Sequence, residues 1–248
     1  QEVTLQAGGS KNVEFVNDKT HLGSLTIQKN LEGAESGSFA FTVTKGNKYY
    51  AADGTESDTE VRLEIQYPGT QSVTVENLKP GTYTVTEVSD KTGYVVSGEG
   101  AVTVKGGQET KVEITNTARG KITVTKTVKV NGEPTTETQM DGTYYFGLYK
   151  TQDGQETLVG EVKSITVTNG SAQGSVTFEN LEPGEYTVKE LSDESGSSVY
   201  AQEGVAVTGD GVQEVTLQAG GSQEIGFVND KTHLGSLTIQ KNLEGAES

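Results

Sequence analysis

ENLKPGTYTVTEVSD at residues 76–90 and ENLEPGEYTVKELSD at residues 179–193 are two versions of one stretch, and this stretch decides the fold. In each copy Pro-Gly marks a turn, after which Tyr, Val and Glu alternate with Thr or Lys. A period of two is typical of a strand with one buried face. Similar runs recur between Gly-containing turns, and no segment shows a sustained helical period. We predict all-β domains, each an antiparallel β-sandwich of about seven strands.

Two internal repeats predict the domain organisation. Residues 1–36 recur at residues 213–248 with an offset of 212, and the two copies differ only at Lys11–Glu14. A fainter repeat relates residues 23–29, 76–90 and 102–117 to later stretches, with offsets of 97, 103 and 113. The growing offset indicates small insertions in the second domain, one of which, around Val205–Glu214, we expect to form an extra hairpin.

The repeats predict four segments in a tandem array. Two are complete sandwiches, at residues 23–117 and 120–230. Residues 1–18 read as the last strand of a preceding domain, and residues 235–248 as the first strand of a following domain. The linkers are short and contain no Gly/Ser-rich or Pro-rich tract, which favours a rod in which neighbouring repeats of the same polypeptide are the main partners.

Composition excludes several classes of function. The 248 residues carry 19 basic and 35 acidic side chains, a formal net charge of −16, and no Cys. This acidity argues against a nucleic-acid or anionic-membrane partner, because both need a basic surface. The lack of Cys excludes disulfides, thiolate metal sites and cysteine nucleophiles. Only 31% of the residues are apolar and no long apolar run exists, so we expect no membrane insertion.

Three strands of each domain place a polar residue on the face that is otherwise apolar. In a strand, Lys29 lies on the same face as Leu25 and Ile27, because alternate residues share a face. Lys126 likewise lies on the same face as Ile122 and Val124. The same argument puts a glutamate and an asparagine into each core. These residues are Glu87 and Asn116 in the first domain and Glu190 and Asn229 in the second, while the terminal segments carry only Asn17 and Lys241.

The Lys–Glu–Asn pattern has two interpretations. One is a buried Lys–Glu ion pair capped by the asparagine amide. The other is a reaction, because desolvation disfavours the charged forms of both ionisable groups and a neutral lysine amine is a nucleophile. A neutral glutamate could give a proton to the asparagine carbonyl and then pass one to the departing ammonia. The product would be an intramolecular Lys–Asn isopeptide bond.

Three pairs of motifs carry a resemblance to a known family: KPGTYTVTE and EPGEYTVKE, the opening GSLTIQK and GKITVTK, and the closing VEITNT and IGFVND. They resemble collagen-adhesin B-type domains, the isopeptide-forming, prealbumin-like and Ig-like sandwiches of Gram-positive pilins and surface adhesins. The resemblance implies that Lys29 joins Asn116 with Glu87 as catalyst, and that Lys126 joins Asn229 with Glu190. Asn17 and Lys241 would each need a partner outside the chain. An insertion displaces Tyr200 from the position that Tyr94 takes after Glu87.

The resemblance implies a structural function: a stalk repeat of a wall-anchored, extracellular adhesin or pilus-like filament. The chain would then not be an enzyme, beyond one autocatalytic turnover per crosslink, and would need no cofactor. The alternative is a ligand-binding adhesin region, whose partner would be a host protein or a glycan. Such a ligand could also bind at a tip outside this sequence. A glycoside hydrolase module would need paired acids, and each core offers only one. We expect no metal site, since Asp53, Glu56, Asp58 and Glu60 read as a solvated acidic loop rather than a calcium site.

Overall fold

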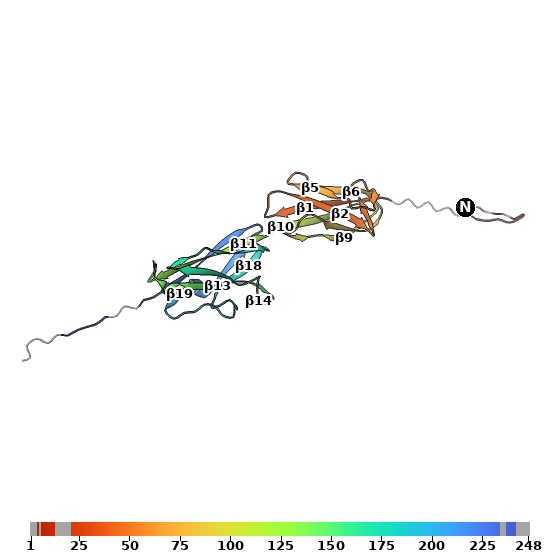
Figure 1. Cartoon of the computed structure of the whole chain (residues 1–248). Coiled ribbons are helices and arrows are strands. Elements are labelled where there is room, and N and C mark those ends of the chain that lie inside the picture. The colour runs from red at the N-terminus through yellow and green to blue at the C-terminus, as the bar shows by residue number, and fades with distance from the viewer. Residues whose placement is uncertain (1–3, 5, 13–20, 234–236, 242–248) are drawn as a thin grey trace, which may run out of the picture. The chain divides into compact units, whose positions relative to one another are not determined.

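The computed structural model describes residues 4, 6–12, 21–233 and 237–241, which form two compact units flanked by terminal segments (Figure 1). The strands form two β-sandwiches, one within residues 23–118 and one within residues 120–231, and no described sheet contains strands of both. The fold class is therefore the predicted one.

The first sandwich consists of two sheets. Its strands are β1 (Gly23–Glu32), β2 (Gly37–Lys45), β3 (Lys48–Tyr50), β4 (Glu56–Ser57), β5 (Leu63–Tyr67), β6 (Ser72–Leu78), β7 (Gly81–Glu87), β8 (Tyr94–Ser97), β9 (Gly100–Val104) and β10 (Glu109–Ala118). One sheet has the strand order β6-β1-β10-β8, so the first and last strands are neighbours. The other has the order β4-β3-β2-β7-β9, and β5 also pairs with β2.

The second sandwich repeats this plan. Its strands are β11 (Gly120–Val130), β12 (Glu133–Pro134), β13 (Gly142–Gln152), β14 (Gln155–Leu158), β15 (Lys163–Thr168), β16 (Ser171–Ala172), β17 (Val176–Leu181), β18 (Gly184–Leu191), β19 (Val205–Val207), β20 (Val212–Leu217) and β21 (Ser222–Lys231). One sheet has the order β12-β11-β21-β19, with β17 also on β11, and the other has the order β16-β15-β13-β18-β20, with β14 on β13. Two 3₁₀ turns, η1 (Thr138–Met140) and η2 (Thr208–Gly211), complete it.

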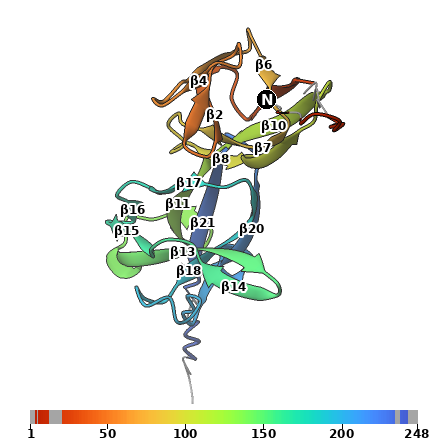
Figure 2. The same ribbon diagram turned by 90° about the vertical axis from the view of Figure 1, so that its right-hand side faces the viewer.

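The first and last strands of the second sandwich run parallel and side by side (Figure 2). Their ladder is continuous from Lys121 opposite Ser222 to Val130 opposite Lys231. In this register Lys126 lies opposite Phe227, and Asn229 lies opposite Val128. Because side chains alternate between the faces of a sheet, Lys126 and Asn229 share the core-facing side.

The Pro-Gly-x-Tyr motif has the same local structure in both sandwiches. The Tyr83 hydroxyl donates to the carbonyl of Lys79 at 2.8 Å, and the Tyr186 hydroxyl donates to the carbonyl of Glu182 at 2.7 Å. Each tyrosine is buried and so closes its own Pro-Gly turn from the core side. This bond fixes the start of β7 and of β18, the strands that carry Glu87 and Glu190 at their far ends.

Two sequence-based expectations about the strands are wrong. The structure shows ten strands in the first sandwich and eleven in the second, because hairpins at the sheet edges add short strands to the seven expected. The segment Val205–Glu214 is not an extra hairpin. Its strand β19 pairs with β21 in one sheet, and β20 pairs with β18 in the other, so the segment crosses the sandwich as β8 and β9 do in the first.

The strands expected at the two ends of the chain stay predictions. In the segment 1–18 only residues 4 and 6–12 are described, and they form no strand. Residues 237–241 also form no strand. Asn17 lies outside the described residues, whereas Lys241 is described and is exposed.

Candidate functional site

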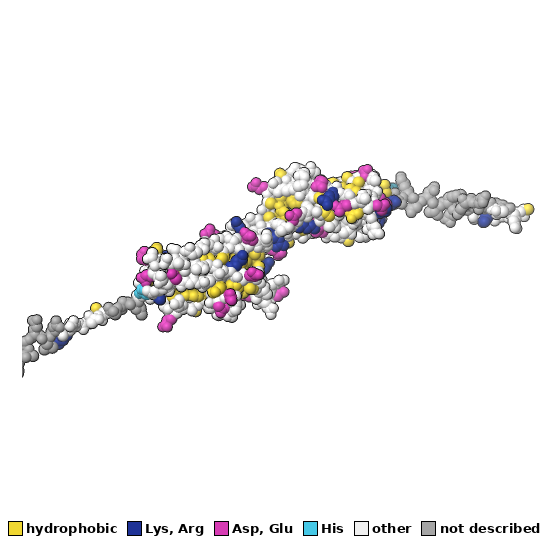
Figure 3. All heavy atoms as spheres, in the orientation of Figure 1, with side chains coloured by type: hydrophobic (Ala, Val, Ile, Leu, Met, Phe, Trp, Pro, Cys, Tyr) yellow, Lys and Arg dark blue, Asp and Glu magenta, His cyan; other side chains and the backbone are white. Residues whose placement is uncertain are grey.

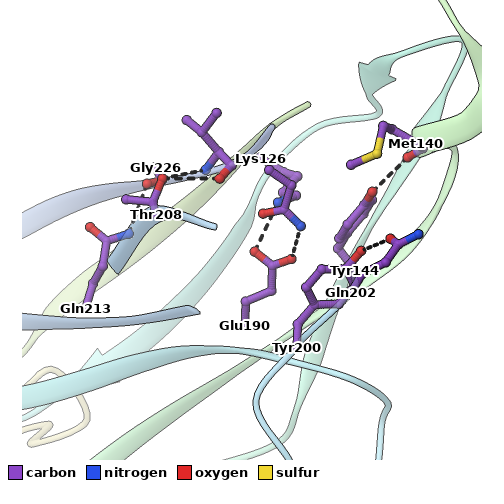
Figure 4. A network of polar contacts seen from close by, with 11 residues as sticks. Lys126, Met140, Tyr144, Glu190, Tyr200, Gln202, Thr208, Gln213 and Gly226 are labelled. Carbon is purple, nitrogen blue, oxygen red and sulfur yellow. Dashed lines mark hydrogen bonds and ion pairs between the residues drawn. The ribbon is translucent and has the colours of Figure 1, made fainter. Parts of the chain in front are cut away.

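The second sandwich brings three predicted polar residues together in its core. Lys126 comes from β11 and Asn229 from β21, while Glu190 reaches them from β18 in the facing sheet. The Lys126 Nζ donates to Glu190 Oε2 at 3.0 Å, and the Asn229 Nδ2 donates to Glu190 Oε1 at 2.6 Å. The carboxylate therefore bridges the amine and the amide, as seen around Glu190 in Figure 4.

Water is excluded from this bridge. The Glu190 and Asn229 residues are 0% exposed and Lys126 is 5% exposed. Burial lowers the pKa of Lys126 to about 8, although the nearby Glu190 carboxylate opposes the shift. Desolvation is thus the larger influence on the amine, and it favours the uncharged, nucleophilic form.

Aromatic rings lie beside the amine of Lys126. The Lys126 Nζ lies 4.4 Å from the ring centre of Tyr144, whose hydroxyl donates to the Met140 carbonyl at 2.8 Å. The ring of Tyr200 lies against Tyr144, with 5.7 Å between the centroids. Figure 4 shows Tyr144 and Tyr200 beside Glu190. The rings limit the positions open to the amine, which is held between the Tyr144 face and the carboxylate.

Tyr200 reaches the site despite the insertion before it. The inserted stretch folds back on β18, where Leu191 forms an isolated bridge with Val199 and the Tyr200 N–H donates to the Glu190 carbonyl at 2.9 Å. The hydroxyl then donates to Gln202 Oε1 at 2.6 Å. Burial raises the pKa of Tyr200, and the Glu190 carboxylate raises it further, which agrees with a position next to that carboxylate.

The first sandwich buries the equivalent three residues but bonds its lysine differently. Lys29 and Asn116 are 0% exposed and Glu87 is 2% exposed. The Lys29 Nζ donates to the backbone carbonyls of Asn30, at 2.8 Å, and Ile114, at 3.3 Å. These two carbonyls are its hydrogen-bond acceptors among the described residues. The amine also lies 4.5 Å from the centre of the Phe39 ring, the counterpart of Tyr144.

Electrostatics of the first site resemble those of the second. Burial lowers the pKa of Lys29 to about 8, and the Glu87 charge opposes this shift. Glu87 Oε1 accepts a hydrogen bond from the Ser89 hydroxyl at 2.7 Å. The corresponding serine of the second sandwich, Ser192, donates instead to the Val199 carbonyl at 3.1 Å. The inserted stretch thus draws Ser192 away from the Glu190 carboxylate.

The structure places all six residues chosen from strand parity in the two cores. Sequence reasoning missed Phe39 and Ser89 as neighbours of the first site and left the position of Tyr200 open. A signal for Phe39 existed, since it alternates with Phe41 as Tyr144 does with Phe146. Nothing in the sequence indicated that Ser89 would bond to Glu87, because both domains have a serine two residues after the glutamate.

The acidic loop around Asp53 has its carboxylates engaged separately. Asp53 accepts from the Thr55 N–H at 2.9 Å, Glu56 from the Tyr50 hydroxyl at 3.3 Å, Asp58 from Lys48 at 2.5 Å and Glu60 from Arg62 at 2.6 Å. Across the part of the chain that the structure describes, no group of three or more His, Cys, Asp or Glu side chains could hold a metal ion. Likewise, none of the described helices is long and apolar enough to cross a membrane.

Comparison with known proteins adds one family match. The model of the SpaA family, described as a prealbumin-like fold domain, matches residues 23–118, which span β1 to β10. No curated protein matches the chain.

Several solved structures are similar at low identity. The Bacillus anthracis TIE protein is 21% identical, with 85% of this chain and 34% of that protein covered and a TM-score of 0.33. The Streptococcal ancillary pilin is 18% identical, with 86% and 63% covered and a TM-score of 0.37. A single B repeat unit of the collagen-binding surface protein of Staphylococcus aureus is 18% identical, with 85% and 98% covered and a TM-score of 0.29. The chain thus spans about a third of the first protein and less than two thirds of the second.

Proposed function

We propose that the chain, whose residues 23–118 match the model of the SpaA prealbumin-like fold domain, is a stalk repeat of an extracellular, wall-anchored bacterial adhesin or pilus-like filament. In this proposal each sandwich is stiffened by an intramolecular isopeptide bond, Lys29 to Asn116 and Lys126 to Asn229. The observation that carries the proposal is the buried Glu190 carboxylate, which bonds to both the Lys126 amine and the Asn229 amide.

The reaction begins with a proton transfer inside the buried pair. A Lys–Glu pair can exist as ammonium and carboxylate or as amine and carboxylic acid, and both forms hold the same number of protons. Burial favours the neutral form because it removes two charges from a medium of low dielectric constant. Lys126 then carries a lone pair, and Glu190 carries a proton that it can donate.

Bond formation follows from the arrangement of the three groups. The amine attacks Cγ of Asn229 while the Glu190 acid donates its proton to Oδ1, which requires the amide to turn its oxygen toward Glu190. In the present orientation the Asn229 Oδ1 has no hydrogen-bond partner among the described residues, so this turn leaves no acceptor bond behind. Glu190 then takes a proton from the former amine and delivers it to the departing nitrogen. As one ammonia leaves, the proton on Oδ1 returns to Glu190, which restores the amide carbonyl and leaves Glu190 protonated, as it began.

Contact between the reactants supplies the rate that solution lacks. An amine and an amide do not condense readily in water, but fixed neighbours react with a high effective concentration. Each bond forms once and consumes its own lysine, so the chain is not an enzyme. No cofactor is required by these steps.

The parallel pairing of β11 and β21 supports a mechanical role. A pull on Gly120 and Lys231, which lie at opposite ends of this ladder, shears all of its hydrogen bonds together. A covalent bond from Lys126 to Asn229 carries the load across the ladder instead. The rest of the sandwich is then outside the path of the force.

The surface supports a stalk in an aqueous setting. Acidic side chains are scattered over the faces seen in Figure 3, with lysine and arginine between them. The net charge of −16 keeps copies of such a chain apart and soluble. A host ligand, if one exists, stays an alternative partner for the adhesin as a whole, and a binding screen against glycans and matrix proteins would test for it.

The decisive test is the intact mass of the purified chain. We expect a deficit of two ammonia molecules, with crosslinked peptides that join Lys29 to Asn116 and Lys126 to Asn229. Glu87→Ala and Glu190→Ala should each restore one ammonia, and each should leave the bond of the other sandwich in place. A mass equal to that of the linear chain would contradict the proposal and favour a buried ion pair.

A further inference from the structure

The second sandwich contains two Asn-Gly pairs, and both form two-residue hairpin turns. Asn131 and Gly132 connect β11 to β12, and Asn169 and Gly170 connect β15 to β16. All four residues have positive φ, namely 53° and 82° in the first turn and 49° and 70° in the second. Such turns match the twist of a hairpin, and Asn-Gly is the sequence that adopts them best.

Asn-Gly is also the dipeptide most prone to deamidation. The backbone nitrogen of the glycine loses its proton and attacks Cγ of the asparagine, which expels ammonia and closes a succinimide ring. Water then opens the ring to aspartate or isoaspartate. Glycine permits this because it has no side chain to shield its nitrogen. Neither asparagine is buried, so water can reach both.

In both turns the attacking nitrogen is hydrogen-bonded to a carboxylate. The Gly132 N–H donates to Asp230 Oδ1 at 3.0 Å. The Gly170 N–H donates to Asp141 Oδ1 at 2.9 Å, and the Asn169 N–H donates to the other oxygen of Asp141 at 2.8 Å. The two carboxylates come from unrelated places, the end of β21 and the residue before β13, yet they make the same contact.

We propose that Asp230 and Asp141 keep Asn131 and Asn169 from deamidating, so that each turn is a modification site held in an unreactive state. A carboxylate that accepts the glycine N–H stabilises the protonated nitrogen and opposes negative charge on it. The nitrogen must also leave this bond before it can approach Cγ. An aspartate is too weak a base to remove an amide proton, so its presence slows the reaction rather than catalysing it. The proposal is independent of the isopeptide bonds.

The chain offers an internal control at the turn between β13 and β14. Asp153 and Gly154 occupy a two-residue hairpin turn with φ of 53° and 76°, the same conformation as the two Asn-Gly turns. Both residues are exposed. The Gly154 N–H donates to no side chain within the described residues. Asp153→Asn therefore creates a third Asn-Gly turn that lacks the carboxylate.

The experiment follows deamidation in the full chain carrying Asp153→Asn. The protein is incubated at mildly alkaline pH, and peptide mapping measures the conversion of each asparagine to aspartate or isoaspartate. We expect the introduced asparagine to react at least about tenfold faster than Asn131 and Asn169, the factor that corresponds to one hydrogen bond to a charged group. Equal rates at the three turns would overturn the proposal, because turn geometry alone would then set the rate.

A second variant tests the carboxylate itself. Asp230→Asn, in the Asp153→Asn background, keeps an oxygen acceptor near Gly132 and removes only the charge, while Asp230→Ala removes both. We expect the deamidation rate at Asn131 to rise in Asp230→Asn and to rise further in Asp230→Ala. The deamidation rate at Asn169 should stay unchanged and serves as the internal reference. An unchanged or slower rate at Asn131 in Asp230→Ala would overturn the proposal. A rise at Asn169 as well would also overturn it, since general loosening would then explain the change.

Discussion

The two sandwiches bury the same three residue types on matched strands and yet bond their lysines differently. Lys126 donates to the Glu190 carboxylate, whereas Lys29 donates to the carbonyls of Asn30 and Ile114. Burial lowers the pKa of both lysines to about 8, so the difference does not lie in desolvation. It lies in local hydrogen bonding, and the segment that follows the glutamate also differs between the two sandwiches.

That segment is longer in the second sandwich. It folds back on β18, holds Ser192 on the Val199 carbonyl and places Tyr200 beside Glu190. In the first sandwich Ser89 remains on Glu87. The comparison teaches that strand parity determines which residues are buried, but not which hydrogen bonds the buried lysine makes.

The largest effect should come from removing each crosslink by substituting its asparagine, which leaves the lysine and the glutamate in place. Asn116→Ala and Asn229→Ala delete the amide that the lysine attacks. The lost bonds enclose 88 residues, 29 to 116, and 104 residues, 126 to 229. Treated as chain crosslinks, each should lower the free energy of unfolding by about 4–5 kcal/mol. Denaturant unfolding of each variant measures this.

The two losses should be nearly equal, because loop-closure entropy changes slowly with length. A large loss in one sandwich and none in the other would show that only one crosslink forms. The comparison would then extend from hydrogen bonding to the reaction itself.

Sequence alone predicted which residues enter the two cores because strand parity is a local property. Lys29, Glu87 and Asn116 lie on three separate strands, and in each the period of two sufficed. Sequence could not predict the partner of the lysine amine, which depends on ångström-scale packing between strands far apart in the chain. The position of Tyr200 next to Glu190 could not be predicted from the sequence either, since the path of an inserted loop depends on what it packs against.

A smaller effect concerns the dependence of stability on pH when the second crosslink is absent. In the Asn229→Ala variant Lys126 keeps its amine. The pKa of this amine is about 8 in the folded protein, against an ordinary value of 10.5. Just below pH 8 the Lys126–Glu190 pair holds one proton in the folded and in the unfolded protein, so the full cost of burial is present. Between about pH 8 and 10.5 the unfolded chain binds more protons than the folded one, and stability therefore rises with pH. The gain should approach a value on the order of 3 kcal/mol.

Urea unfolding of Asn229→Ala across this pH range measures the gain. Lys126→Met in the same background should remove it, because no buried amine remains to titrate. The chain with both crosslinks should also lack this dependence, since its lysine nitrogens are amides. A similar rise with pH in that chain would indicate amines that never reacted, and so would contradict the proposed bonds.

The smallest effect tests the serine that distinguishes the two sites. The Ser89 hydroxyl donates to Glu87 and so stabilises the ionised carboxylate, which is the wrong form for donating a proton. Ser89→Ala should therefore speed formation of the Lys29–Asn116 bond, by up to about tenfold for one side-chain hydrogen bond. Ser192→Ala is the matched control, and it should leave the Lys126–Asn229 bond unaffected because Ser192 bonds to Val199. The time course of ammonia loss in freshly synthesised protein, followed by mass spectrometry, gives both rates. Slower crosslinking in Ser89→Ala would mean that the serine orients Glu87 for the reaction, and the difference in hydrogen bonding between the two sandwiches would then favour the first site rather than the second.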